Sequence, residues 1–161
     1  MEEVKIGRKV MVAVDETEES MYALEWALDH LIIPGDSPAS DKLILMHAQL
    51  PAGANTPLTG HVAFTGHVLD ILERREATNS RQILTRAKGI CEKRNVAVES
   101  KVVEGEAKYA ICEAVNQMRV DLLVVGSRSH GAIKRAFGRS VSDYCSHNAK
   151  CPVVIVKRQD E

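Results

Sequence analysis

The chain has 161 residues, 45% of them hydrophobic and 27% charged, which is typical of one globular domain with a substantial core. Its 21 basic and 22 acidic residues give a formal net charge of −1, so the basic excess of nucleic-acid-binding proteins is absent and we expect no nucleic acid as a partner. The N-terminus lacks a signal-peptide pattern, and no apolar run approaches the ~20 residues that span a bilayer, so we expect no membrane and a cytoplasmic protein.

Short apolar runs predict five strands. Four are continuous and rich in Val and Ile, as in parallel strands covered on both faces: residues 10–14, 43–48, 122–126 and 152–156. The fifth run, residues 96–103, alternates between apolar and polar residues. It predicts a strand at an edge of the sheet, or one with a wetter face.

Apolar residues at three- and four-residue spacing predict helices between these strands. The helical patterns cover residues 18–32, 68–94, 107–118 and 141–148. Thr17 or Asp15 is expected to cap the first helix. The second pattern predicts one long helix, or two helices broken near Thr78 and Asn79.

This alternation predicts one α/β domain over residues 1–161, with an open parallel sheet and helices on both faces. The long loop 49–66 follows a strand, so it is expected at the carboxyl ends of the strands, where open α/β sheets bind ligands. A loop of this length is typical of a lid or a partner surface.

The stretch GSRSHGAIKRAFGRSVSDYC, residues 126–145, joins a buried strand to a helix. A helix start favours an anion through its backbone N–H groups and its dipole. Gly126 predicts a sharp turn and a close approach of the ligand, and Arg128 and Arg139 could neutralise phosphate. Hydroxyl donors are supplied by Ser127, Ser129, Ser140 and Ser142. A solvated basic loop with serine caps would explain the same residues.

Four segments, in order over nearly the whole chain, resemble a universal stress protein of the single-domain kind common in plants: VMVAVDETEES, LILMHA, DLLVVGSRSHGAIKRAFGRSVSDYC and HNAKCPVVIVK. The resemblance implies an adenine nucleotide alpha hydrolase-like fold, with five parallel strands in the order 3-2-1-4-5. It also implies a homodimer formed through the last strand, about residues 152–157. The apolar character of that strand favours the dimer independently, because an exposed apolar edge strand aggregates unless a partner covers it.

The resemblance further implies ATP or AMP bound at the carboxyl ends of strands one and four, with Mg²⁺ expected only as the companion of a triphosphate. Nucleotide-binding members of this family carry G-x-x-G-x(9)-G-[ST]; the matching positions here are Gly126, Ser129, Arg139 and Ser140. Arg139 would either clamp or block the anion, and Asp15 is expected to accept hydrogen bonds from ribose hydroxyls. The expected nucleotide-binding residues are Ala13, Val14, Asp15, His47, Ala48, Val125, Gly126, Arg128, Ser129, Arg139, Ser140, Val141 and Ser142.

The expected function is binding of the nucleotide as a regulatory ligand in a stress response. The alternative is a stress protein of the same fold that works without nucleotide, through protein contacts or chaperone-like activity, as Ser129 and Arg139 favour. By resemblance, ATP hydrolysis would be slow at most, and no residue is expected to be catalytic, since no Walker motif or general base is evident.

Three other kinds of site have little support. GSRSHG does not match the G-x-S-x-G pattern of serine hydrolases. His47, His61 and His67 have no carboxylate or cysteine at a spacing typical of metal sites. The cysteines form no C-x-x-C pair, so we expect reduced, mostly packed thiols, with redox control near the last strand a secondary hypothesis for Cys145 and Cys151.

Overall fold

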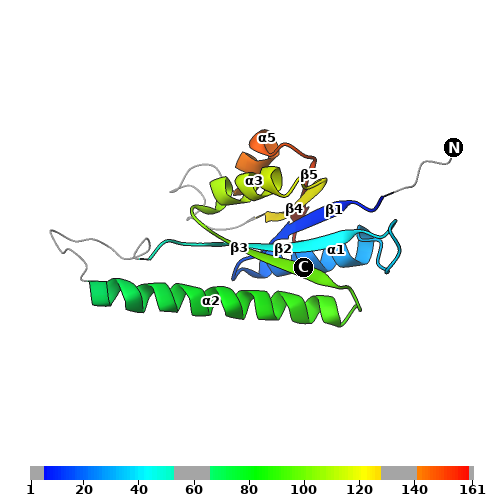
Figure 1. The fold of residues 1–161 in the computed structure, drawn as a ribbon. Coiled ribbons are helices and arrows are strands. Elements are labelled where there is room, and N and C mark those ends of the chain that lie inside the picture. Colours follow the sequence, from blue (N-terminus) through cyan, green and yellow to red (C-terminus); the bar gives the residue numbers. More distant parts are fainter. Residues whose placement is uncertain (1–5, 53–65, 128–140, 160–161) are drawn as a thin grey trace.

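In the computed structural model, the described residues are 6–52, 66–127 and 141–159. Strands and helices alternate along them (Figure 1). The elements are β1 (Lys9–Ala13), α1 (Glu18–His30), β2 (Lys42–Gln49), α2 (Gly66–Glu92), β3 (Val98–Glu104), α3 (Ala107–Gln117), β4 (Leu122–Ser127), α5 (Val141–Asn148) and β5 (Val153–Lys157). No helix in these ranges is long and apolar enough to cross a membrane.

The strands form one sheet in the order β3-β2-β1-β4-β5, and every neighbouring pair is parallel. This confirms the predicted order 3-2-1-4-5. The middle strand β1 is the most enclosed, with Val10, Met11 and Val12 fully buried. β3 lies at one edge, as its alternating pattern predicts, and β5 lies at the other.

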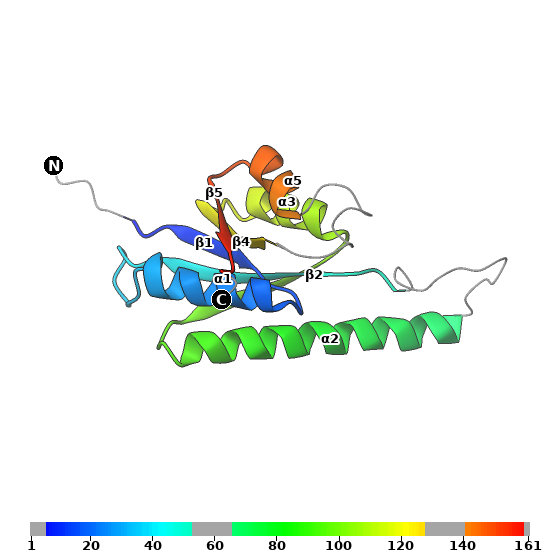
Figure 2. The same ribbon diagram turned by 180° about the vertical axis from the view of Figure 1, so that it is seen from behind.

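The alternation of side chains along each strand divides the core into two layers. Val10 and Val12 face α1 and α2, whereas Met11 faces α3 and α5. Figure 2 shows the same division from behind, with α1 and α2 on one side of the sheet and α3 and α5 on the other. Both faces of the central strands are therefore covered by apolar residues, which explains why their sequences are continuous apolar runs.

Helix α2 is a single helix of 27 residues, so the predicted break near Thr78 and Asn79 does not occur. At 1.5 Å per residue it is roughly 40 Å long. Its second half packs on the sheet through Ile83, Leu84 and Ala87. Its first turns project past the strands in Figures 1 and 2, where Ile71 is 53% exposed.

A buried carboxylate fixes the connection between α1 and β2. The Asp41 side chain is 1% exposed and accepts hydrogen bonds from Nε of Arg8 at 3.0 Å, Nη2 of Arg8 at 2.7 Å and N of Ile33 at 2.9 Å. Burial opposes ionisation of Asp41, but these hydrogen bonds and the guanidinium charge outweigh it and hold the pKa of Asp41 below its ordinary value.

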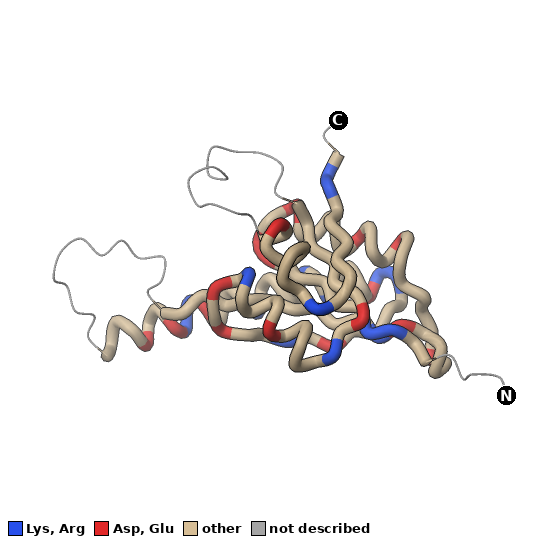
Figure 3. The backbone as a smooth tube through the Cα atoms, turned by 90° about the horizontal axis from the view of Figure 1, so that it is seen from above, with Lys and Arg blue, Asp and Glu red and all other residues tan. Residues whose placement is uncertain are grey.

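Acidic and basic residues are interspersed along the described part of the chain (Figure 3).

Candidate functional site

The carboxyl ends of β1, β2 and β4 and the starts of α3 and α5 surround a cavity of about 80 Å³. Every expected nucleotide-binding residue in the described part of the chain lines it: Ala13, Val14, Asp15, His47, Ala48, Val125, Gly126, Val141 and Ser142. The other expected residues, Arg128, Ser129, Arg139 and Ser140, lie outside the described residues. Small-molecule sites usually measure ~300–1,000 Å³, so this cavity by itself is smaller than such a site.

The β1–α1 turn is fixed by its own polar groups. The Asp15 carboxylate accepts a hydrogen bond from N of Thr17 at 2.8 Å and one from the Thr17 hydroxyl. Oγ1 of Thr17 in turn accepts from N of Ser20 at 3.2 Å, so Thr17, rather than Asp15, caps α1. Oγ of Ser20 accepts from N of Asp15 at 3.0 Å. These bonds hold a carboxylate at the cavity wall, where it can accept hydrogen bonds from hydroxyl groups.

His47 links the ends of β1 and β2. Its side chain is buried, and Nδ1 lies 2.9 Å from the carbonyl oxygen of Val14. Because a carbonyl oxygen only accepts, Nδ1 carries a hydrogen, and in the neutral ring Nε2 is then an acceptor. The main chain adds a bond from N of Val14 to O of Met46 at 2.8 Å. His47 is thus a positioning residue for the ends of both strands.

Gly126 is a strand residue. It lies within β4 and pairs with Val156 of β5, so the predicted sharp turn does not occur at this position. A Cβ atom here would lie 2.7 Å from O of Glu19 and 3.1 Å from N of Ser20, both in the first turn of α1. The glycine is needed because the backbone of α1 packs directly on the end of β4. Glycine also leaves room at the cavity, which Gly126 lines.

The sequence did not point to several cavity residues. These are Thr17, Ser20, Met46, Ala107 and Ile111. Ala107 and Ile111 belong to α3, which lies over the sheet because the chain crosses from β3 at one edge to β4 beyond β1. The predicted strand order together with the right-handed crossover rule was the available signal for this placement.

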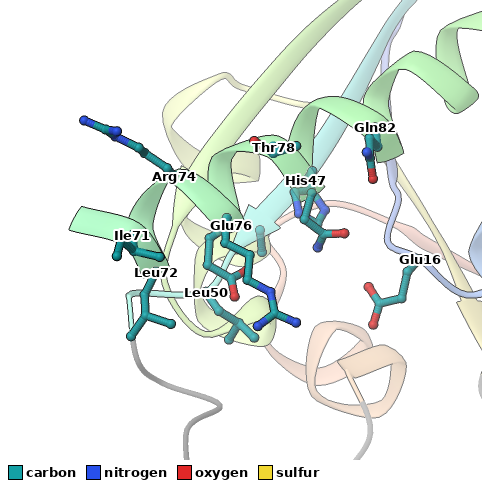
Figure 4. Close-up of a pocket in the computed structure, with 12 residues that line it drawn as sticks. Glu16, His47, Leu50, Ile71, Leu72, Arg74, Glu76, Thr78 and Gln82 are labelled. Atoms are coloured by element: carbon teal, nitrogen blue, oxygen red, sulfur yellow. The ribbon is translucent and has the colours of Figure 1, made fainter. Parts of the chain in front are cut away.

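A second, larger hollow of about 730 Å³ lies between the end of β2 and the first half of α2 (Figure 4). His47 and Ala48 line both hollows, so the two are neighbours. In Figure 4, Glu16 and Gln82 lie on one side of this space and Leu50 and Leu72 on the other, whereas the Arg74 side chain points away from it. Leu50, Ile71, Leu72, Arg75, Glu76, Thr78 and Asn79 complete the lining. Within the described ranges, no group of three or more His, Cys, Asp or Glu side chains is placed to hold a metal ion.

Comparisons with known proteins agree with this architecture. Universal stress protein PHOS34 of Arabidopsis thaliana is 32% identical over 164 residues, which cover 96% of this chain; the chain spans 63% of the length of PHOS34. Universal stress protein YxiE of Bacillus subtilis is 31% identical over 150 residues, covering 92% of this chain and 98% of YxiE.

Among solved structures, a universal stress protein family protein from Arabidopsis thaliana with AMP bound superposes with a TM-score of 0.66 at 25% identity, covering 94% of this chain and 92% of that one. The model of the universal stress protein family matches residues 7–157. The chain therefore belongs to the universal stress protein family.

Proposed function

We propose that this protein binds an adenine nucleotide, AMP or ATP, as a regulatory ligand in a stress response. The observation that carries the proposal is the convergence of the described nucleotide-binding candidates on one cavity at the carboxyl ends of β1 and β4. Ligands bind open parallel sheets at this place, where the strand order reverses. The AMP-bound Arabidopsis relative, which is similar over nearly the whole chain, supports the same ligand class.

In this proposal, the base, the ribose and the phosphates of the nucleotide contact different parts of the cavity. The base lies against the apolar surface of Ala13, Val14 and Ala48, and the Asp15 carboxylate accepts ribose hydroxyl hydrogen bonds. The phosphates face the start of α5, where the positive end of the helix dipole favours an anion. Arg128, Ser129, Arg139 and Ser140 lie outside the described residues and are expected from the family motif to contact the phosphates, and Mg²⁺ accompanies the ligand only when it is ATP.

The first test is isothermal titration calorimetry of the purified protein with AMP, ADP and ATP, with and without Mg²⁺. Micromolar binding by the natural sequence is the expected result. Asp15→Asn, which keeps the size of the side chain, should weaken binding about 10- to 100-fold, because a hydrogen bond to a charged group is lost. The matched control is Asp36→Asn, an exposed residue of the α1–β2 connection, which should leave the affinity unchanged.

Arg139→Gly separates this proposal from its alternative. Weaker binding by this variant would mean that Arg139 clamps the phosphates. Failure of the natural sequence to bind, with binding restored by Arg139→Gly, would mean that arginine has closed the site. Absence of binding in both proteins would refute the nucleotide proposal.

The second candidate function is a nucleotide-independent stress protein that acts through protein contacts. The specific observation in its favour is that Ser129 and Arg139 occupy motif positions that are glycine in nucleotide-binding members. In either case we propose one domain over residues 1–161, a cytoplasmic location and a homodimer through β5, whose Ile155 is 37% exposed. Hydrolysis of ATP would be slow at most, and no catalytic residue is assigned.

A further inference from the structure

Two thiols meet where α3 packs on α5. Cys112 lies on α3 and Cys145 on α5, and their Sγ atoms are 3.8 Å apart. Cys145 is fully buried, while Cys112 is half-buried. Neither residue lines the nucleotide cavity.

The two helices are held together beside this pair. The rings of Tyr109 and Tyr144 meet edge to face with centroids 5.2 Å apart. Nζ of Lys108 lies 5.1 Å from the centroid of the Tyr109 ring and 5.5 Å from that of the Tyr144 ring. Because the helices are already in contact, bond formation needs only a change of about 1.8 Å between the two Sγ atoms, to the ~2.05 Å of a disulfide. Side-chain rotation and a small helix shift can provide this.

The surroundings favour this pair over other combinations. Cys91 lies on the opposite face of the sheet, in the core layer of α1 and α2, and so cannot reach either thiol. Cys151 is half-buried and packs against the same layer as Cys112 and Cys145, so it is the competing partner. Cys145 is fully buried and Cys112 is half-buried, so Cys112 is the thiol that an oxidant reaches first.

We propose that Cys112 and Cys145 form an oxidation site that hydrogen peroxide converts to an intrachain disulfide tying α3 to α5. In the first step the Cys112 sulfur attacks peroxide, the O–O bond breaks, and sulfenic acid and one water form. In the second step the Cys145 sulfur attacks the Cys112 sulfur, the S–O bond breaks, the S–S bond forms and a second water leaves. One peroxide is reduced, and the two thiols together lose two electrons and two protons.

The bond would close a loop between residues that are 33 positions apart in the sequence. Such a cross-link restricts the unfolded chain, and for a chain of this size it should raise Tm by about 5–10 °C. The rise should vanish when the disulfide is reduced again.

The test uses the full chain, first reduced, then freed of reductant and treated with one equivalent of hydrogen peroxide. Remaining thiols are alkylated, and the protein is digested without reductant for mass spectrometry. The expected product is a peptide pair that joins Cys112 to Cys145 within one chain, lighter by two hydrogen atoms than the separate peptides. The same pair should form in Cys151→Ser and be absent from Cys112→Ser.

Circular dichroism confirms that each variant folds, and Cys112→Ser is chosen because its site is half-exposed and tolerates a hydroxyl. The higher Tm of the oxidised protein should be absent from Cys112→Ser. The proposal is overturned if Cys112 pairs with Cys151, if the disulfide joins two chains, or if both thiols of the pair remain open to alkylation after peroxide treatment. None of these measurements uses a nucleotide, so their outcome is independent of the nucleotide proposal.

Discussion

Gly126→Ala tests the close packing between the end of β4 and the first turn of α1. The added Cβ would lie 2.7 Å from O of Glu19, 2.9 Å from C of Glu19 and 3.1 Å from N of Ser20. All three are backbone atoms, so no side-chain rotation can relieve the contact. The start of α1 must move outward by several tenths of an ångström, and overpacking of this kind costs about 1–3 kcal/mol.

Urea unfolding followed by circular dichroism should show that loss in the free energy of unfolding, and Tm should fall by roughly 2–10 °C. Gly89→Ala is the matched control, because Gly89 is a partly buried residue inside α2 with no atom within 4 Å of the position of an added Cβ. The same chemical change there should stabilise the protein by about 0.5–1 kcal/mol. If Gly126→Ala were as stable as the natural protein, the packing explanation of this glycine would be wrong.

Two further predictions concern the described polar and edge residues. Asp41→Asn should cost about 1–2 kcal/mol at neutral pH, since Arg8 stays half-exposed and partly solvated. The pKa of Asp41 is lowered in the folded state, so its stabilisation is present above the ordinary pKa of about 4 and is lost as the pH falls through the lower folded value. Urea unfolding at pH 7 and pH 3 should therefore show a smaller difference between the two proteins in acid, and an equal difference at both values would contradict this. Ile155→Lys should give a monomer by size-exclusion chromatography with light scattering, whereas Val102→Lys on the opposite edge strand, a residue 42% exposed, should remain dimeric. A dimer of unchanged stability in Ile155→Lys would count against the β5 interface.

The fold could be predicted because its physical causes are local. The continuous apolar runs of β1, β2 and β4 mark strands covered on both faces, and the alternating sequence of β3 marks an edge strand; β5 is also an edge strand, but its apolar run does not reveal it. The unbroken course of α2 through Thr78 and Asn79 was not decided by the sequence. Thr78 and Asn79 have weak helix propensity, but packing of the second half of α2 on the sheet overrides it and the helix continues through them.

The site was predicted less completely, because its walls come from elements distant in the sequence. The strand-end residues Asp15 and His47 were predicted from the resemblance to the family, and their position agrees with the rule that parallel sheets bind ligands at their carboxyl ends. Ile111 belongs to a helix whose place depends on the whole crossover from β3 to β4, so no local pattern marks it. The sequence predicted that a glycine is needed at position 126, but for a sharp turn. The structure shows that the glycine is needed because the backbone of α1, more than a hundred residues away in the sequence, packs against it.

The two sheet edges differ in a way that limits how the chain can associate. β3 exposes Glu99, Lys101 and Glu104 beside Val102, whereas β5 carries Val153, Val154 and Ile155 and one charged residue at its end, Lys157. Charged side chains on an edge strand oppose the addition of a further strand, while an apolar edge favours it. In the proposed homodimer, β5 would pair with β5 through the same surface on both partners, so the assembly would close after two chains. A head-to-tail array would bring β5 against the charged side chains of the β3 edge, which oppose the addition of a strand.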